Sequence, residues 1–100
     1  MAKRDFERET AIREFICDYI RREHGTDRLD AEFHEEFTNR FGGKRTMYYW
    51  GSCPNHLAMQ WLKRLYDEGT LQRAPIGLTN HEVGFPNWVY TYSLCTQNES

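Results

Sequence analysis

One helical stripe in the second half of the chain places the strongest constraint on the fold. Between residues 53 and 68, apolar side chains recur three and four positions apart, the spacing of one face of an α-helix. They are Leu57, Ala58, Trp61, Leu62 and Leu65. Ser52 is a suitable cap and Pro54 suits a first turn, while Gly69 is typical of the residue that ends a helix. The sequence therefore predicts a helix over about 53–68 with one buried face.

The opposite face of this predicted helix is polar. At 100° per residue it carries His56, Gln60, Lys63 and Asp67, with Arg64 on its edge. Amide, imidazole and cationic groups of this kind can form hydrogen bonds with a polar or anionic partner. We therefore expect this face to lie in solvent and to be the first candidate for a binding surface.

Two further helices are predicted earlier in the chain. The first runs from about Asp5 to His24, and Gly25 follows where a helix commonly ends in a left-handed residue. The second runs from about Leu29 to Phe41, is capped by Asp27 or Asp30, and stops at Gly42–Gly43. Their apolar stripes are Ile12, Phe15, Ile16, Tyr19 and Ile20, and then Leu29, Phe33, Phe37 and Phe41. We expect both stripes in the core and His34 at the edge of the second.

The last third of the chain favours a β-hairpin. Residues 71–78 and 88–94 are β-prone, and the segment 77–86 between them holds turn-forming residues. The predicted fold class is therefore α+β, a three-helix bundle followed by a two-stranded antiparallel hairpin. We expect one domain over 1–95 and a polar tail over 96–100. Residues 44–51 fit either a short strand or a loop folded onto the core.

Several function classes find no support in the sequence. No apolar run approaches the roughly 18 residues needed to cross a membrane, and the charged N-terminus has no secretory signal, so we expect a cytoplasmic protein. Cys17, Cys53 and Cys95 have no metal-binding or disulfide spacing, and we expect reduced thiols. No catalytic motif is present. We therefore expect no enzyme activity, no metal and no cofactor.

Positive charge is concentrated in the middle of a slightly acidic chain. The formal net charge is −2, but residues 40–73 hold six basic and only two acidic side chains. By contrast, residues 1–39 hold seven basic and eleven acidic ones. This distribution favours an anionic partner for the middle third of the chain.

The order of the predicted elements, together with residues 55–73, resembles winged helix-turn-helix domains of bacterial and phage-type regulators. In those families the recognition helix ends in Leu-Lys-Arg-Leu, a few polar residues and a Gly, as residues 62–69 do here, and a strand with an exposed Arg follows. The segment Val89–Leu94 is similar to their second wing strand. The resemblance covers about the last half of the chain and implies a winged-helix fold.

The resemblance also implies double-stranded DNA as the partner. The third helix would enter the major groove, where Gln60 suits adenine and Lys63 or Arg64 suits guanine or phosphate. The wing loop near Asn80 and His81 would approach the minor groove or the backbone. The implied DNA contacts are Lys44, Arg45, Asn55, His56, Gln60, Lys63, Arg64 and Arg73. Such regulators commonly bind as dimers, so a homodimer is a further expectation.

Three departures from the family pattern keep a second hypothesis open. The connection before the third helix is long, the wing loop has no Lys or Arg, and the chain is acidic overall. These departures weaken the DNA interpretation, and the acidic N-terminal third and the aromatic linker favour a winged-helix module that docks on a protein partner instead. Its working surface would be the acidic first helix together with the aromatic segment Met47, Tyr48, Tyr49 and Trp50.

Overall fold

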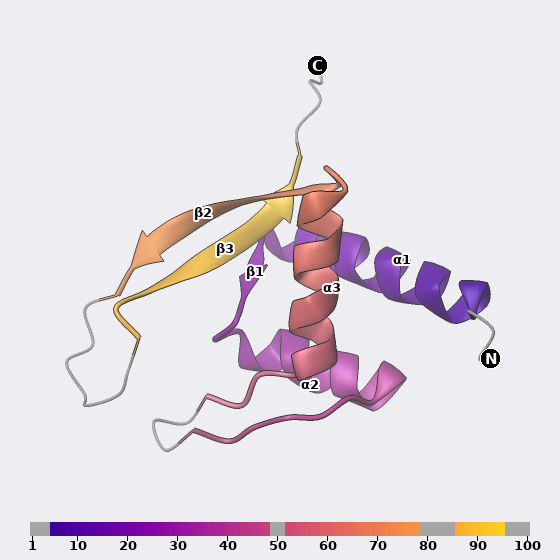
Figure 1. The fold of residues 1–100 in the computed structure, drawn as a ribbon, viewed down its shortest axis with the longest axis horizontal. Helices are drawn as coiled ribbons and strands as arrows, with labels where there is room; N and C mark the ends of the chain where they lie inside the picture. The colour runs from indigo at the N-terminus through magenta and orange to yellow at the C-terminus, as the bar shows by residue number, and fades with distance from the viewer. Residues whose placement is uncertain (1–4, 49–51, 79–85, 96–100) are drawn as a thin grey trace.

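The computed structural model describes residues 5–48, 52–78 and 86–95. Figure 1 shows the helices packed together and the long hairpin of the antiparallel sheet extending away from them. In chain order the elements are α1 (Phe6–Glu23), β1 (Thr26–Asp27), α2 (Ala31–Phe41), α3 (His56–Asp67), β2 (Leu71–Gly77) and β3 (Trp88–Leu94). The α+β class, the three helices and the C-terminal hairpin are therefore confirmed.

The core forms where the predicted helical stripes meet. Its members are almost fully shielded from solvent because each stripe packs against the other two helices and the base of the hairpin. They are Ile12, Ile16, Tyr19, Ile20, Phe33, Phe37, Ala58, Trp61, Leu62, Leu65, Leu71 and Tyr92. Phe15 and Phe41 pack on the margin, with ring centroids 5.8 Å apart. The assignment of the α1 stripe and of Phe33, Phe37 and Phe41 to the core is confirmed, whereas Leu29 precedes α2 and does not belong to the core cluster.

The sheet contains a third strand that the sequence did not predict. β1 pairs with β3 through Thr26↔Tyr92 and Asp27↔Thr91, so the strand order is β1-β3-β2. A two-residue strand is too short to show an alternating pattern, and this hides it in the sequence. Gly25 permits the approach, because a Cβ there would lie 3.2 Å from the carbonyl oxygen of Tyr92. The left-handed residue that ends α1 is His24, one position earlier than expected.

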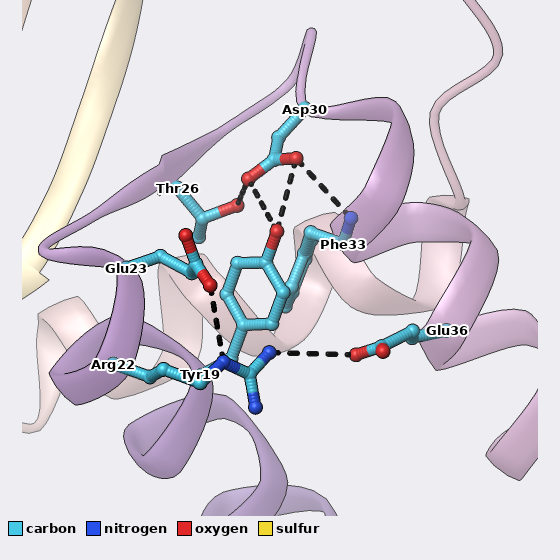
Figure 2. Close-up of polar contacts among 7 residues, drawn as sticks. All are labelled: Tyr19, Arg22, Glu23, Thr26, Asp30, Phe33 and Glu36. Atoms are coloured by element: carbon cyan, nitrogen blue, oxygen red, sulfur yellow. Dashed lines mark hydrogen bonds and ion pairs between the residues drawn. The ribbon is translucent and has the colours of Figure 1, made fainter.

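A polar contact fixes the corner between α1 and α2 (Figure 2). The Asp30 carboxylate caps α2 by accepting from the Phe33 amide at 3.2 Å. It also accepts from the Tyr19 hydroxyl at 3.0 and 3.1 Å and from the Thr26 hydroxyl at 2.9 Å. Burial and the bond to Asp30 raise the pKa of Tyr19, so its hydroxyl stays protonated and donates. One carboxylate thus joins α1, β1 and α2.

The third helix starts later than predicted. Asn55, not Ser52, is its N-cap, and its side chain accepts from the Ala58 amide. Pro54 therefore precedes the cap instead of occupying the first turn. The reason is tertiary, because Asn55 is buried against α2 and this burial decides which of the available polar residues caps the helix.

The segment before α3 runs back along itself. The amide of Tyr48 donates to the carbonyl of Ser52 at 2.8 Å, and the amide of His56 donates to that of Lys44, also at 2.8 Å. These hydrogen bonds do not form a continuous ladder, because the only β-bridge between the two sides among the described residues is Arg45↔Asn55. Residues 44–48 therefore form a loop and not a strand.

No helix in the described part of the chain has the length and apolar character of a membrane span.

Candidate nucleic-acid interface

The exposed face of α3 is the centre of the candidate site. Trp61, Leu62 and Leu65 point into the core, with exposed fractions of 6%, 0% and 0%. Because the buried stripe holds the helix on one side, the residues on the opposite side are exposed to solvent. We call this surface the outer stripe and define it as His56, Gln60, Lys63 and Asp67. The orientation expected for α3 is confirmed, except at Arg64.

Arg64 faces α1 instead of joining the outer stripe. Its guanidinium lies 3.8 Å from Glu9 of α1 and 3.4 Å from Glu68, and it stacks on the Trp61 ring at 4.5 Å. Arg13 of α1 forms two hydrogen bonds to the same Glu68 carboxylate, at 2.6 and 2.8 Å. The positive charge of Arg64 is thus directed at acidic side chains of the protein itself. The structure gives Arg64 a role in joining α3 to α1.

The other cations predicted to contact DNA are Lys44, Arg45, Lys63 and Arg73. Lys44 is exposed beside its N-terminus, and the Nε of Arg45 donates to the carbonyl of Cys53 at 2.8 Å. Lys63 pairs with Asp67 one turn away, with Nζ 2.8 Å from Oδ2. Arg73 of β2 sits 4.0 Å from the centroids of both the Tyr66 and Tyr90 rings. The structure brings Lys44 and Arg45 to the start of the outer stripe, while Arg73 is held between aromatic rings.

Asn55 is inside the protein and cannot serve as a DNA contact. Its exposed fraction is 0%, its Oδ1 accepts from the Ala58 amide, and its Nδ2 donates to the Thr38 hydroxyl and to the Gly42 carbonyl. The adjoining Gly43 has φ +106°, and a Cβ there would lie 2.6 Å from the Asn55 Oδ1. The Asn55 side chain fixes the start of α3 and is not accessible to DNA, so the prediction that it contacts DNA was wrong.

His34 is also internal, so the expectation that it lies at an edge was wrong. Its exposed fraction is 1%. Its Nδ1 accepts from the backbone amide of Asn55 at 3.0 Å, which leaves the proton on Nε2, 3.1 Å from the carbonyl of Asp27. Burial lowers the pKa of His34 to about 4, so the ring is neutral at physiological pH. The imidazole links the end of β1 to the cap of α3.

His56 keeps its place in the candidate site. It is exposed in the first turn of α3, and its Nε2 lies 2.7 Å from the Thr46 hydroxyl of the preceding loop. This bond orients the imidazole and joins the loop to the outer stripe. Thr46 itself was not among the predicted residues.

Arg28 is a second residue that sequence reasoning missed. Its guanidinium stacks on the ring of Tyr48 at 5.1 Å and donates to the Tyr48 hydroxyl at 2.8 Å. Together with His56 and Gln60 these residues line a shallow cleft of about 360 Å³ at the start of α3. Arg28 lies in the acidic third of the sequence, far from the helix it adjoins, and no local pattern marks it.

The predicted aromatic surface is only partly described. Met47 is 71% exposed, whereas Tyr48 is half-buried and bonded to Arg28. Tyr49 and Trp50 lie outside the described residues, as do Asn80 and His81 of the wing loop. All three cysteines are free thiols, and among the described residues no three acidic, His or Cys side chains are grouped as metal ligands.

The comparisons with known proteins add no relative. No family model matches the chain, and neither a curated protein nor a solved structure matches it.

Proposed function

We propose that this chain is a winged-helix domain that binds double-stranded DNA with α3 in the major groove. The observation that carries the proposal is the outer stripe, a polar face presented by a helix whose other side is anchored in the core. The element order α1-β1-α2-α3-β2-β3 and the sheet order β1-β3-β2 support the fold assignment, since a hairpin follows α3 in the position of a wing. The major groove, about 12 Å wide, accepts a helix of this kind.

Each contact in the proposal follows from side-chain chemistry. The Gln60 amide can donate and accept at the same time, which suits the N6 and N7 atoms of adenine. His56 and Lys63 extend the same face by one turn in each direction and suit base edges or phosphates. Lys44 and Arg45 adjoin the N-terminus of α3, where helix polarity also favours a phosphate.

The proposal implies that contacts to phosphates contribute only modestly to the affinity for DNA. Lys63 is already paired with Asp67, and Arg64 is directed at α1, so few cations remain for phosphates. With about three or four phosphate contacts, the logarithm of the affinity should fall against the logarithm of salt with a slope of about −3 to −4. A steeper slope would require basic residues that the proposed site does not contain.

Two neighbouring substitutions test the assignment of the face. Lys63→Ala removes a side chain of the outer stripe and should weaken duplex binding about tenfold while flattening the salt slope by about one. Arg64→Ala is the matched control, because it removes the same charge one residue away on the side that faces α1. Binding measured by fluorescence anisotropy should be nearly unchanged in the control. Equal losses in the two variants would contradict the proposed orientation.

A protein partner is the second candidate, and an exposed apolar side chain on α1 favours it. Phe6 is 66% exposed and lies in a shallow hollow shared with Glu7 and Glu14. An exposed aromatic side chain surrounded by polar groups is common at protein-docking surfaces. This candidate predicts no duplex binding at high micromolar protein, where even non-specific DNA binding is detectable.

A further inference from the structure

A hollow of about 450 Å³ lies between β3 and α3, apart from the outer stripe. Its wall includes the aromatic row Trp88, Tyr90 and Tyr92, whose side chains share one face of β3 because alternate residues of a strand point the same way. Met59 of α3 and Arg28 also line the hollow. Sites for small molecules have this size and this mostly apolar lining, with a few polar groups that orient the ligand.

Trp88 contributes an exposed indole ring to the hollow. The side chain is 51% exposed, although it packs edge-on against Tyr90 with ring centroids 4.8 Å apart and an interplanar angle of 81°. Tyr90 is different, because the guanidinium of Arg73 covers it at 4.0 Å. A planar ring entering the hollow would therefore stack chiefly on Trp88.

Arg28 supplies a positive charge that the described protein does not neutralise. Arg13, Arg21, Arg22 and Arg64 each pair with a carboxylate. Within residues 5–48, 52–78 and 86–95, the partner of Arg28 is the uncharged Tyr48 hydroxyl. That contact occupies one nitrogen and holds the guanidinium in place, which leaves donors for an anion at little cost in ordering.

We propose that this hollow binds a small planar aromatic anion, with the ring on Trp88 and the anionic group on Arg28. A carboxylate or a phosphate matches the forked donors of a guanidinium. An aromatic carboxylate and a nucleoside monophosphate both carry this pairing of ring and charge. The inference goes beyond DNA binding: neither Arg28 nor Trp88 belongs to the outer stripe, although Arg28 also lines the cleft beside His56 and Gln60.

Calorimetric titration of the whole chain with matched probes tests the proposal. The ring–anion probes are indole-3-acetate and adenosine monophosphate, and the control probes are indole, acetate and inorganic phosphate, which carry only a ring or only a charge. At least one ring–anion probe should bind about tenfold more tightly than every control probe. The probe that binds identifies the source, since indole-3-acetate represents carboxylates and adenosine monophosphate represents nucleotides. If neither binds more tightly than the controls, the proposal is overturned.

Three variants assign the binding to the hollow. Arg28→Gln should weaken the ring–anion probe at least about tenfold, because charge-assisted hydrogen bonds are lost. Trp88→Ala should weaken it several-fold and, since this ring is half exposed, should leave the fold intact even if Arg28→Gln does not. Arg40→Gln, at an exposed position outside the hollow, is the matched control and should have no effect. Unchanged affinity in Trp88→Ala, or an equal loss in Arg40→Gln, would contradict the assignment.

Discussion

At the scale of single residues, a buried polar pair positions the proposed DNA-binding helix. His34 and Asn55 are both inside the protein, and the bond between them joins α2 to the start of α3. Such groups are stable only when every donor and acceptor is used, since an unpaired buried polar atom costs about 1–3 kcal/mol. Their substitution should therefore change stability more than any residue of the outer stripe.

Asn55→Ala should lower the free energy of unfolding by about 2–4 kcal/mol. The substitution removes the helix cap and leaves the partners of Nδ2, the Thr38 hydroxyl and the Gly42 carbonyl, without their donor. Asn55→Ser is the matched control, because a serine hydroxyl can still cap the helix while the Nδ2 donor is lost, so its effect should be smaller. Urea denaturation measures both, and equal effects would show that capping is not a separate contribution.

The protein should lose stability as the pH falls from about 6.5 towards 4. The pKa of His34 is lowered from 6.5 to about 4 in the folded state, so the unfolded chain binds the extra proton within this window. The loss should approach about 3 kcal/mol at the lower end, offset in part by Asp27, whose pKa burial raises.

Urea denaturation at several pH values tests this expectation. His34→Gln removes the titrating ring and should flatten the dependence, whereas His24→Asn, at an exposed position, should keep it. A wild-type curve that is flat between pH 6.5 and pH 4 would contradict the buried neutral imidazole.

At the scale of elements, the helical stripes were predictable and the contacts between elements were not. Periodicity located α1, α2, the buried face of α3 and the hairpin strands, because burial imposes a repeat of 3.6 or 2 residues. It did not show β1, which has only two residues, or the start of α3, which depends on burial of Asn55 against α2. Where an edge residue such as Arg64 points depends on Glu9, more than fifty positions earlier in the chain.

Truncation of two adjacent residues on α3, Gln60 and Trp61, should have different effects on stability and on DNA binding. Trp61→Ala should cost about 3–5 kcal/mol of stability, because a large buried side chain is removed from the centre of the core. Gln60→Ala should change stability by less than about 0.5 kcal/mol, since its side chain is exposed, yet it should weaken duplex DNA binding. Thermal melting and anisotropy on the same samples would separate the two roles. A stability loss in Gln60→Ala close to that in Trp61→Ala would contradict this division of the helix.

At the scale of the whole molecule, charge is divided between two surfaces. Glu9 of α1 and Glu68 pair with Arg64, and Glu7 and Glu14 lie beside Phe6, while Lys44 and Arg45 adjoin the start of the outer stripe. The sequence predicted that the middle third of the chain is basic. It did not predict that part of this positive charge pairs with acidic residues of the protein itself, because pairing depends on which helices pack together.

The central claim is that the outer stripe is the surface that meets DNA. Titrating ¹⁵N-labelled protein with a short duplex at low salt, and following the amide resonances, tests this claim most directly. We expect the largest shifts at residues 44–46 and 56–63, with α1 little affected. Shifts concentrated along α1, or no shift at high micromolar duplex, would contradict the proposed function.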